Sequence, residues 1–266
     1  MKTRVLSAIV IIAIFVPFLI IGGYPFAGLV TILSLLGLYE LLKVRESRKK
    51  FPTLLKIVAY LLTVYFCLYN TGSIEYSNYI DYRVISLIIF VFLSPMVFIN
   101  DTKKYNLNDA LFLIGSVLFI GFSFNLIIIT RNYDLIYILY LLIITTITDT
   151  FAMFTGMMIG KHKLCPKISP GKTIEGLIGG VLMGTFVASA YYNTVISPHA
   201  SLVFVIMLTL VLCLIGQLGD LIFSTIKRYY GVKDFSELIP EHGGILDRFD
   251  SLIFVILAYI IVHGIL

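Results

Sequence analysis

The chain has 266 residues, of which 59% are hydrophobic and 13% are charged, and its mean hydropathy is +0.99. This composition excludes a water-soluble domain of the same length, because such a domain needs a much more polar surface. Apolar runs of nearly twenty residues without alternating polarity predict membrane-spanning helices rather than barrel strands. We therefore expect an all-α, polytopic membrane protein, with residues 1–266 forming a single integral membrane domain.

The apolar runs predict about nine transmembrane helices in chain order. Their approximate ranges are 5–22, 25–42, 53–69, 84–99, 108–129, 134–154, 174–192, 201–223 and 249–266. The first run follows two basic residues, as in a signal peptide. We expect it to be a retained span, because it is long for a signal sequence and no small-residue cleavage site follows it.

The basic residues are distributed very unevenly among the connecting segments. If the N-terminus is cytoplasmic, 18 of the 20 lysines and arginines fall on the cytoplasmic side, and only Arg83 and Arg131 fall on the other. This asymmetry predicts a protein of the cytoplasmic membrane whose N-terminus lies inside. The basic residues of the 43–56 loop have no accompanying acidic pattern and are expected to serve topology alone. The three cysteines are widely separated, so we expect neither zinc binding nor a disulfide.

The eighth apolar run carries polar residues at helical spacing. Gln217, Asp220, Ser224 and Lys227 recur at i, i+3, i+7 and i+10, which places them on one helix face. A carboxylate deep in a membrane costs roughly 2.5–3.5 kcal/mol, so Asp220 needs a partner. That partner is either a basic side chain such as Lys227 or a divalent cation shared with Asp247.

A second polar region runs from 145 to 176. Asp149 lies well inside an apolar segment, and Ala152, Gly156 and Gly160 follow at four-residue intervals, which favours close helix packing over a chemical role. The Gly171-Lys172-Thr173 sequence imitates the end of a phosphate-binding P-loop. Pro166 stands where that loop requires a glycine, so the P-loop interpretation fails.

A third polar region precedes the last apolar run. Its two glycines, Gly243 and Gly244, allow a phosphate to approach the backbone, and the helix start that follows offers free N–H groups. Asp250 can belong to this phosphate site, or it can be an ordinary acidic residue in the first turn of a helix. His242 is expected to shape its turn rather than to catalyse.

These regions also resemble a known family, the phosphatidate cytidylyltransferases (CDP-diacylglycerol synthases). The residues that match its main motif are Ser224, Lys227-Arg228, Lys233-Asp234, Ser236, Pro240, His242-Gly243-Gly244 and Asp247-Arg248-x-Asp250. Ser169-Pro170-x-Lys172-Thr173-x-Glu175-Gly176 and Asp149-Thr150-x-Ala152 resemble a second conserved region, although Gly171 replaces a bulkier polar residue. The resemblance covers a catalytic region of about residues 145–250.

The resemblance implies a membrane enzyme that joins CTP to phosphatidate and yields CDP-diacylglycerol and pyrophosphate, in an active-site cavity that faces the cytoplasm. It implies catalytic roles for Asp149, Asp220, Lys227 and Asp247, and a Mg²⁺ ion held by Asp220 and Asp247, with a second cation left open. The implied substrate-binding residues are Ser169, Lys172, Thr173, Glu175, Ser224, Arg228, Lys233, Asp234, His242, Gly243, Gly244, Arg248 and Asp250. Besides the two substrates and the lipid bilayer, we expect a second copy of the chain in a homodimer and no nucleic-acid partner.

Two alternatives stay open. Another CTP-using membrane enzyme, such as a polyprenol or phytol kinase or an ether-lipid cytidylyltransferase, shares much of this chemistry. An ion-coupled transporter would instead use Asp149 and Asp220 to carry protons or sodium. The transporter needs a gradient across sealed vesicles, whereas an enzyme works in detergent. The chain lacks an Asp-Gly-x-x-Ala-Arg element, which argues against the CDP-alcohol phosphotransferases.

Overall fold

A computed structural model describes residues 2–69, 82–99, 101–239 and 243–263, with side chains from residue 9 onward. The chain divides into two compact units. Unit 1 comprises Met1–Tyr133 and Asp234–Ile245, and unit 2 comprises Asp134–Lys233 and Leu246–Leu266. Helices make up most of both, so the predicted fold class is confirmed for the described residues.

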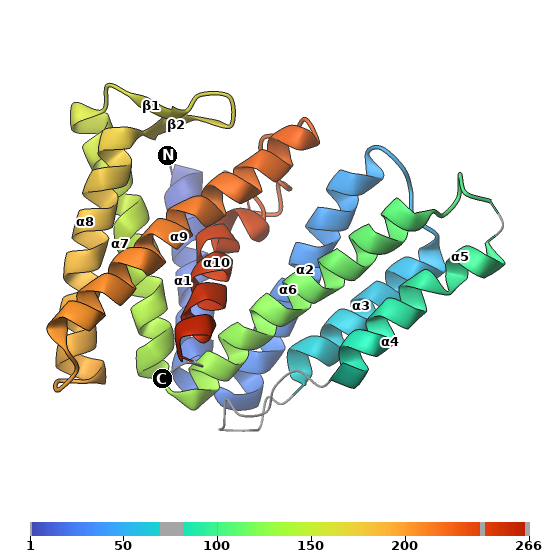
Figure 1. Ribbon diagram of the computed structural model, residues 1–266, viewed down its shortest axis with the longest axis horizontal. Helices are drawn as coiled ribbons and strands as arrows, with labels where there is room; N and C mark the ends of the chain where they lie inside the picture. The colour runs from blue at the N-terminus through green and yellow to red at the C-terminus, as the bar shows by residue number, and fades with distance from the viewer. Residues whose placement is uncertain (1, 70–81, 100, 240–242, 264–266) are drawn as a thin grey trace. The chain divides into compact units, whose positions relative to one another are not determined.

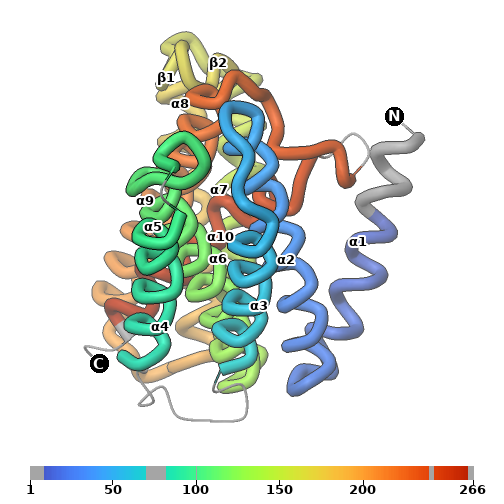
Figure 2. The backbone as a smooth tube through the Cα atoms, turned by 90° about the vertical axis from the view of Figure 1, so that its right-hand side faces the viewer, coloured from blue at the N-terminus to red at the C-terminus, as the bar shows by residue number. Residues whose placement is uncertain are grey.

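Unit 1 is a helical bundle built around one long helix, α6. Its elements are α1 (Lys2–Ile21), α2 (Gly23–Glu46), α3 (Thr53–Leu68), α4 (Tyr82–Leu93), α5 (Pro95–Phe98) and α6 (Leu107–Tyr133). Helix α6 packs against α2, α3 and α4, and α3 runs beside it in both views (Figure 1, Figure 2). Pro95 ends the ladder of α4 and begins the short α5, because a proline has no N–H to donate.

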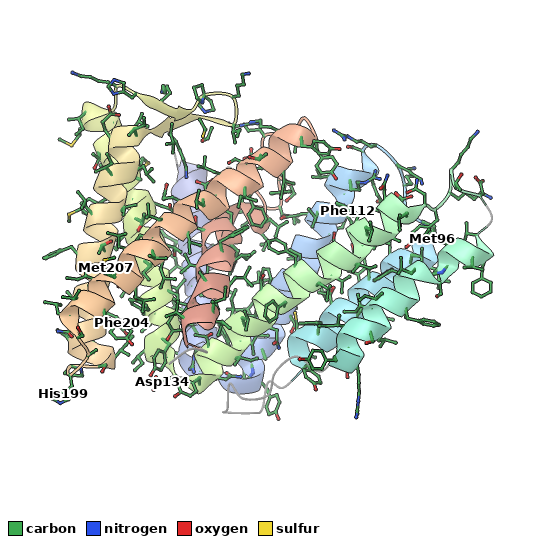
Figure 3. All side chains as sticks on the ribbon, viewed as in Figure 1. Met96, Phe112, Asp134, His199, Phe204 and Met207 are labelled. Atoms are coloured by element: carbon green, nitrogen blue, oxygen red, sulfur yellow. The ribbon has the colours of Figure 1, made fainter. Side chains whose placement is uncertain are left out.

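A buried acid anchors two basic residues near the end of α2, Arg45 and Lys49. Asp109, at the start of α6, is only 1% exposed, and its carboxylate binds Arg45 at 2.9 Å and also Lys49. The Arg45 guanidinium also lies 5.8 Å from the ring centre of Phe112, which Figure 3 labels on α6. The expectation that the basic residues of the 43–56 loop serve topology alone is therefore wrong for Arg45 and Lys49, because their acidic partner comes from a distant helix.

Unit 2 consists of four long helices and a small β-hairpin. Its elements are α7 (Leu135–Ile159), β1 (Lys163–Cys165), β2 (Ser169–Thr173), α8 (Ile174–Tyr191), a π-helical turn (Tyr192–Ile196), α9 (Leu202–Tyr229) and α10 (Leu246–His263). The antiparallel hairpin joins the end of α7 to the start of α8 (Figure 1). Asp134 and His199 mark the opposite end of these helices (Figure 3). Helix α9 packs against α7, α8 and α10, so it is central to the unit.

Small residues bring α7 and α8 into close contact. A Cβ atom added to Gly180 would lie 2.7 Å from the Cβ of Ala152, and one added to Gly176 would lie 2.6 Å from the Ala152 carbonyl oxygen. On the α7 side, a Cβ on Gly156 would lie 2.9 Å from the Thr173 hydroxyl. The packing role predicted for Ala152 and the glycines that follow it is confirmed.

Five described helices are long and apolar enough to cross a membrane. They are α2, α6, α7, α8 with its π-helical turn (Ile174–Ile196), and α9. Three shorter apolar segments, Ile9–Ile21, Thr53–Leu68 and Tyr82–Phe98, coincide with other predicted spans. Helix α10 begins with three charged residues, Asp247, Arg248 and Asp250. A multi-pass membrane protein is thus confirmed, whereas the count of nine spans stays a prediction.

Candidate functional site

The polar face predicted for α9 is present in unit 2. The side chains of Gln217, Ser224 and Lys227 are buried, with 3%, 8% and 8% of each residue exposed. The Ser224 hydroxyl donates to a carboxylate oxygen of Asp220 at 3.2 Å, one helical turn away. These contacts confirm the shared face that the i, i+3, i+7 and i+10 spacing predicts.

Gln217 links three elements of unit 2. Its amide nitrogen donates to Asp149 of α7 at 2.6 Å, and its amide oxygen accepts from Lys172 of β2 at 3.0 Å. The same lysine ammonium lies 2.6 Å from the Asp220 carboxylate. With a donor contact on one side and an acceptor contact on the other, the amide orientation of Gln217 is fixed.

A second lysine, Lys227, lies on the polar face of α9 itself and is more buried than Lys172. The ammonium group of Lys227 donates to Asp247 of α10 at 2.6 Å, and both side chains are largely buried. Three residues further along α10, Asp250 interacts electrostatically with Asp220, Asp149 and Lys227. One Asp250 oxygen also accepts from the backbone N–H of Ser251 at 2.7 Å. The ion pair of Lys227 is thus with Asp247, and the partner of Asp220 is Lys172.

The polar cluster therefore joins four aspartates and two lysines: Asp149, Asp220, Asp247, Asp250, Lys172 and Lys227. If all six are ionised, its formal charge is −2, which leaves it able to accept a further cation. Asp149 is exposed, and the side chains of Lys172 and Asp220 are 20% and 26% exposed, so a ligand can reach them. Apolar side chains such as Met158 and Phe186 face outward from the same unit, at 82% and 71% exposure. Charged groups within such an apolar unit are costly and indicate function.

The described part of the chain contains no group of three or more His, Cys, Asp or Glu side chains placed to hold a metal ion. Both carboxylates predicted to hold Mg²⁺, Asp220 and Asp247, instead contact lysine ammonium groups. Their donor atoms are still the hard oxygens that Mg²⁺ prefers, and each already has a positive group against it. The residue types fit the ion, but the described residues alone offer an incomplete ligand set.

The hairpin residues that resemble the family's second region have structural partners. The Thr173 hydroxyl accepts from the N–H of Gly176 and so caps α8. The Glu175 carboxylate accepts from the backbone N–H groups of Lys161 and His162 and lies 2.6 Å from the His162 ring. Ser169 begins β2 and is half-buried. These contacts hold the hairpin that presents Lys172, while direct substrate binding by these residues stays a prediction.

Arg228 ties the same hairpin to the end of α9. Its guanidinium donates to the carbonyl oxygen of Ile168 at 3.1 Å and to that of Val232 at 3.0 Å. Arg228 thus connects Ile168 of the hairpin turn to the end of α9. Lys233, Asp234 and Arg248 are exposed, and their predicted role toward substrate is not tested by their positions.

The glycine pair of the third region belongs to unit 1. Gly243 has a φ of 80°, a conformation that favours glycine, and its carbonyl oxygen accepts from the Ile239 N–H at 2.9 Å. Gly244 is buried against the carboxylate of Glu40 in α2. His242 lies outside the described residues. The contact partner of Gly244 is therefore an acid from a distant helix, which no motif indicated.

Unit 2 is an apolar helical unit with an accessible anionic cluster that also contains two lysines. This combination is suited to phosphate chemistry supported by cations. Comparison with known proteins agrees with this class. The model of the Cytidylyltransferase family matches residues 2–266. The chain is 37% identical over 256 residues to the phosphatidate cytidylyltransferase of Staphylococcus epidermidis (strain ATCC 35984), and the match covers 96% of each chain.

Two further relatives give the same result. The phosphatidate cytidylyltransferase of Staphylococcus aureus (strain COL) is 38% identical over 257 residues, and that of Staphylococcus haemolyticus is 37% identical over 256 residues. Each match covers 96% of both chains. The chain therefore belongs to the cytidylyltransferase family, and the resemblance found in its motifs is confirmed.

Two polar residues were not among the predicted site residues. The spacing predicts that Gln217 lies on the polar face of α9 but indicates no role in the site. In the structure it contacts both Asp149 and Lys172. Glu40 was hidden within an apolar span. Its signal was a single carboxylate near the end of that span, which alone does not distinguish a buried acid from one at the membrane surface.

Proposed function

We propose that this protein transfers the cytidylyl group of CTP to phosphatidate, forming CDP-diacylglycerol and releasing pyrophosphate. The family match and the names of the relatives support the substrates. The observation that carries the chemistry is the chain of contacts from Asp149 through Gln217 and Lys172 to Asp220. It joins acids and a lysine from three elements at a place that a phosphate can reach.

The reaction is an in-line displacement at the α-phosphorus of CTP. A phosphate oxygen of phosphatidate forms the new P–O bond, and the bond from the α-phosphorus to the oxygen bridging it to the β-phosphorus breaks. The electron pair of that bond leaves with pyrophosphate. Because the attacking phosphate is already ionised, the step needs no general base. The main obstacle is repulsion between two polyanions, so positioned positive charge should dominate catalysis.

The two lysines of the cluster are suited to this role. Lys172 and Lys227 each lie 2.6 Å from a carboxylate, so each is held in place before substrate binds. An ammonium group forms strong, charge-assisted hydrogen bonds with phosphate oxygens. We assign Lys172, on the accessible hairpin strand, to the incoming phosphates and Lys227 to the charge that develops on pyrophosphate.

We also propose that Asp220 and Asp247 hold Mg²⁺ together with the substrate phosphates. Mg²⁺ is commonly bound through one or two carboxylates, with phosphates and water completing its ligands. When bound, the ion would neutralise phosphate charge and orient the displacement. Lys172 and Lys227, which lie 2.6 Å from these two carboxylates, would then donate to the substrate phosphates.

The proposed direction of substrate access follows from the charges around the cluster. Lys161, Lys163 and Lys167 are exposed on the hairpin segment, at the end of unit 2 where α9 finishes. Basic residues favour the cytoplasmic side, so CTP would arrive from there while phosphatidate comes from the bilayer. An N-terminus inside the cell and a homodimer remain predictions of the sequence.

A product assay tests the proposal against its rivals. Protein purified in detergent micelles is supplied with phosphatidate, Mg²⁺ and CTP labelled in the cytosine ring. We expect labelled CDP-diacylglycerol and one pyrophosphate for each product, without any ion gradient. A CTP-dependent lipid kinase would release CDP and leave the label in water. Gradient-driven ion flux without product would support the transporter instead.

A further inference from the structure

Unit 1 contains a fully buried carboxylate that lies outside every family motif. Glu40 has 0% exposure, six residues before the end of α2, which places it ~9 Å inside the helix end. One of its oxygens accepts from the hydroxyl of Ser236 at 2.6 Å and from the backbone N–H of Ile245 at 2.8 Å. Both donors belong to a segment that the structure describes over residues 236–239 and 243–245, about 200 residues further along the chain. A single oxygen of Glu40 thus holds both ends of this segment.

The same segment is shaped to receive this carboxylate. A Cβ atom at Gly244 would lie 2.6 Å from the carboxyl carbon of Glu40, so any larger residue would displace the acid. Gly243 turns the backbone with its positive φ, and the Ile239 N–H closes the turn onto its carbonyl oxygen. The conformation of the segment and the position of Glu40 therefore depend on each other.

We infer that Glu40 is a positioning residue for the transfer reaction: it holds residues 236–239 and 243–245 in the conformation that binds CTP. This inference rests on the proposed function, because Gly243 and Gly244, which lie in this segment, are predicted substrate-binding residues. A carboxyl oxygen can accept more than one hydrogen bond, so a single acceptor is well suited to fixing a segment at two points. Ser236 acquires a specific role as one of the two donors.

The competing explanation is that Glu40 only stabilises the fold. Loss of stability would reduce the amount of folded enzyme but leave the KM for CTP unchanged in what remains. Loss of positioning would raise KM, because part of the binding free energy would be spent on ordering the segment. The two explanations therefore differ in a quantity that does not depend on yield.

The test compares Glu40→Gln, Ser236→Ala and Gly244→Ala with two matched controls. Glu46→Gln removes an acid from the same helix, where it pairs with Lys56 at 2.9 Å and is partly exposed. Gly115→Ala adds a methyl group to a helical glycine of unit 1 with nothing within 4 Å. Each variant is purified in detergent, and its kinetics are measured on the monodisperse fraction.

We expect Glu40→Gln and Gly244→Ala to raise the KM for CTP about tenfold, with kcat changed by less than about threefold. Ser236→Ala, which removes one of the two donors, should raise it about threefold, and the Glu40→Gln/Ser236→Ala variant should be no worse than Glu40→Gln alone. Both controls should keep the KM of the original protein. An unchanged KM in the folded fraction of Glu40→Gln would overturn the inference.

A second measurement does not require activity. Glu237 is exposed between the two points of attachment, so a Glu-specific protease can report on the order of the segment. Cleavage after Glu237, followed by mass spectrometry, should accelerate in Glu40→Gln and stay unchanged in Glu46→Gln. Equal cleavage rates would refute the positioning role. If the original protein made no CDP-diacylglycerol, the proposed function would fail while this measurement still decided whether Glu40 orders the segment.

Discussion

The ammonium group of Lys227 lies 2.6 Å from a carboxylate oxygen of Asp247, and only 10% and 5% of these two side chains are exposed. Lys227 is near the end of α9 and Asp247 is in the first turn of α10. The pair therefore connects the two helices that contain the beginning and the end of the family's main motif. Its burial means that a change to either residue affects stability as well as chemistry.

Lys227→Met should both destabilise the protein and abolish turnover. Removing one partner of a buried pair leaves the other charge uncompensated, at a cost of about 3–5 kcal/mol. The Lys227→Met/Asp247→Asn variant should regain most of the lost thermal stability, because no isolated charge remains, but should stay inactive. Lys227→Arg should fold and retain part of the activity, since it keeps the charge but not the compact geometry. Thermal unfolding in detergent and product formation measure the two effects separately.

One result would remove Lys227 from the proposed mechanism. If the folded fraction of Lys227→Met had full specific activity, the lysine would serve only the ion pair. A Lys227→Met/Asp247→Asn variant as unstable as Lys227→Met alone would show instead that the pair does not explain the stability.

Asp220→Asn should abolish turnover with little loss of stability. The Asp220 and Lys172 side chains are partly exposed, and such pairs contribute only about 0–1 kcal/mol. The melting temperature should thus change by no more than about 2–4 °C. The reaction would fail because the neutral amide cannot replace the carboxylate toward a cation. Near-normal activity at saturating Mg²⁺ would contradict the metal assignment.

The control for this change is Asp134→Asn, at the other end of unit 2. Asp134 accepts from the Ile136 N–H and caps α7, and asparagine caps helices about as well as aspartate. This variant should keep both activity and melting temperature. The comparison separates the loss of any carboxylate in unit 2 from the loss of the one beside Lys172.

Chelation of divalent ions should stop the reaction without unfolding the protein. Among the described residues no three potential ligands converge, so the protein alone should bind Mg²⁺ weakly. We expect calorimetric titration to give much tighter Mg²⁺ binding when a non-hydrolysable CTP analogue is present, because its phosphates supply the missing oxygens. Strong binding without the nucleotide, or full activity in excess chelator, would disprove this arrangement.

Much of the fold followed from the apolar runs, because helices are the simplest way to satisfy backbone groups in lipid. Each predicted span overlaps a described helix, including 84–99, which Pro95 divides into α4 and α5. The hairpin between α7 and α8 was not predicted. Its strands are short and rich in lysine, glycine and proline, so they lack the alternating pattern that identifies a strand.

The site was predictable where its residues share one helix and less so where they meet across helices. The spacing of Gln217, Asp220, Ser224 and Lys227 fixed their common face. It did not determine that Lys172 would pair with Asp220 and Lys227 with Asp247, because these contacts depend on tertiary packing. Glu40 was missed for the same reason, since Ser236 and Ile245, which donate hydrogen bonds to it, are about 200 positions away.

The last prediction concerns the contact between α7 and α8, which determines where Asp149 lies. A Cβ atom on Gly184 would collide with the Thr148 hydroxyl and lie 3.0 Å from the sulfur of Cys213. Gly184→Ala should therefore cost about 1–3 kcal/mol through overpacking and lower the melting temperature in detergent by several degrees. It should also reduce activity, because Thr148 precedes Asp149 and a shift of α7 would move that carboxylate away from Gln217.

A second change should reverse the effect. Thr148→Ala removes the atoms in the way, so the Thr148→Ala/Gly184→Ala variant should recover stability relative to Gly184→Ala alone. Gly115→Ala, on α6 with nothing within 4 Å, provides the control and should be neutral or slightly stabilising, because alanine favours helices over glycine. If Gly184→Ala melted at the same temperature as Gly115→Ala, the two helices would have room to separate without loss. The close packing would then not be what holds Asp149 beside Gln217.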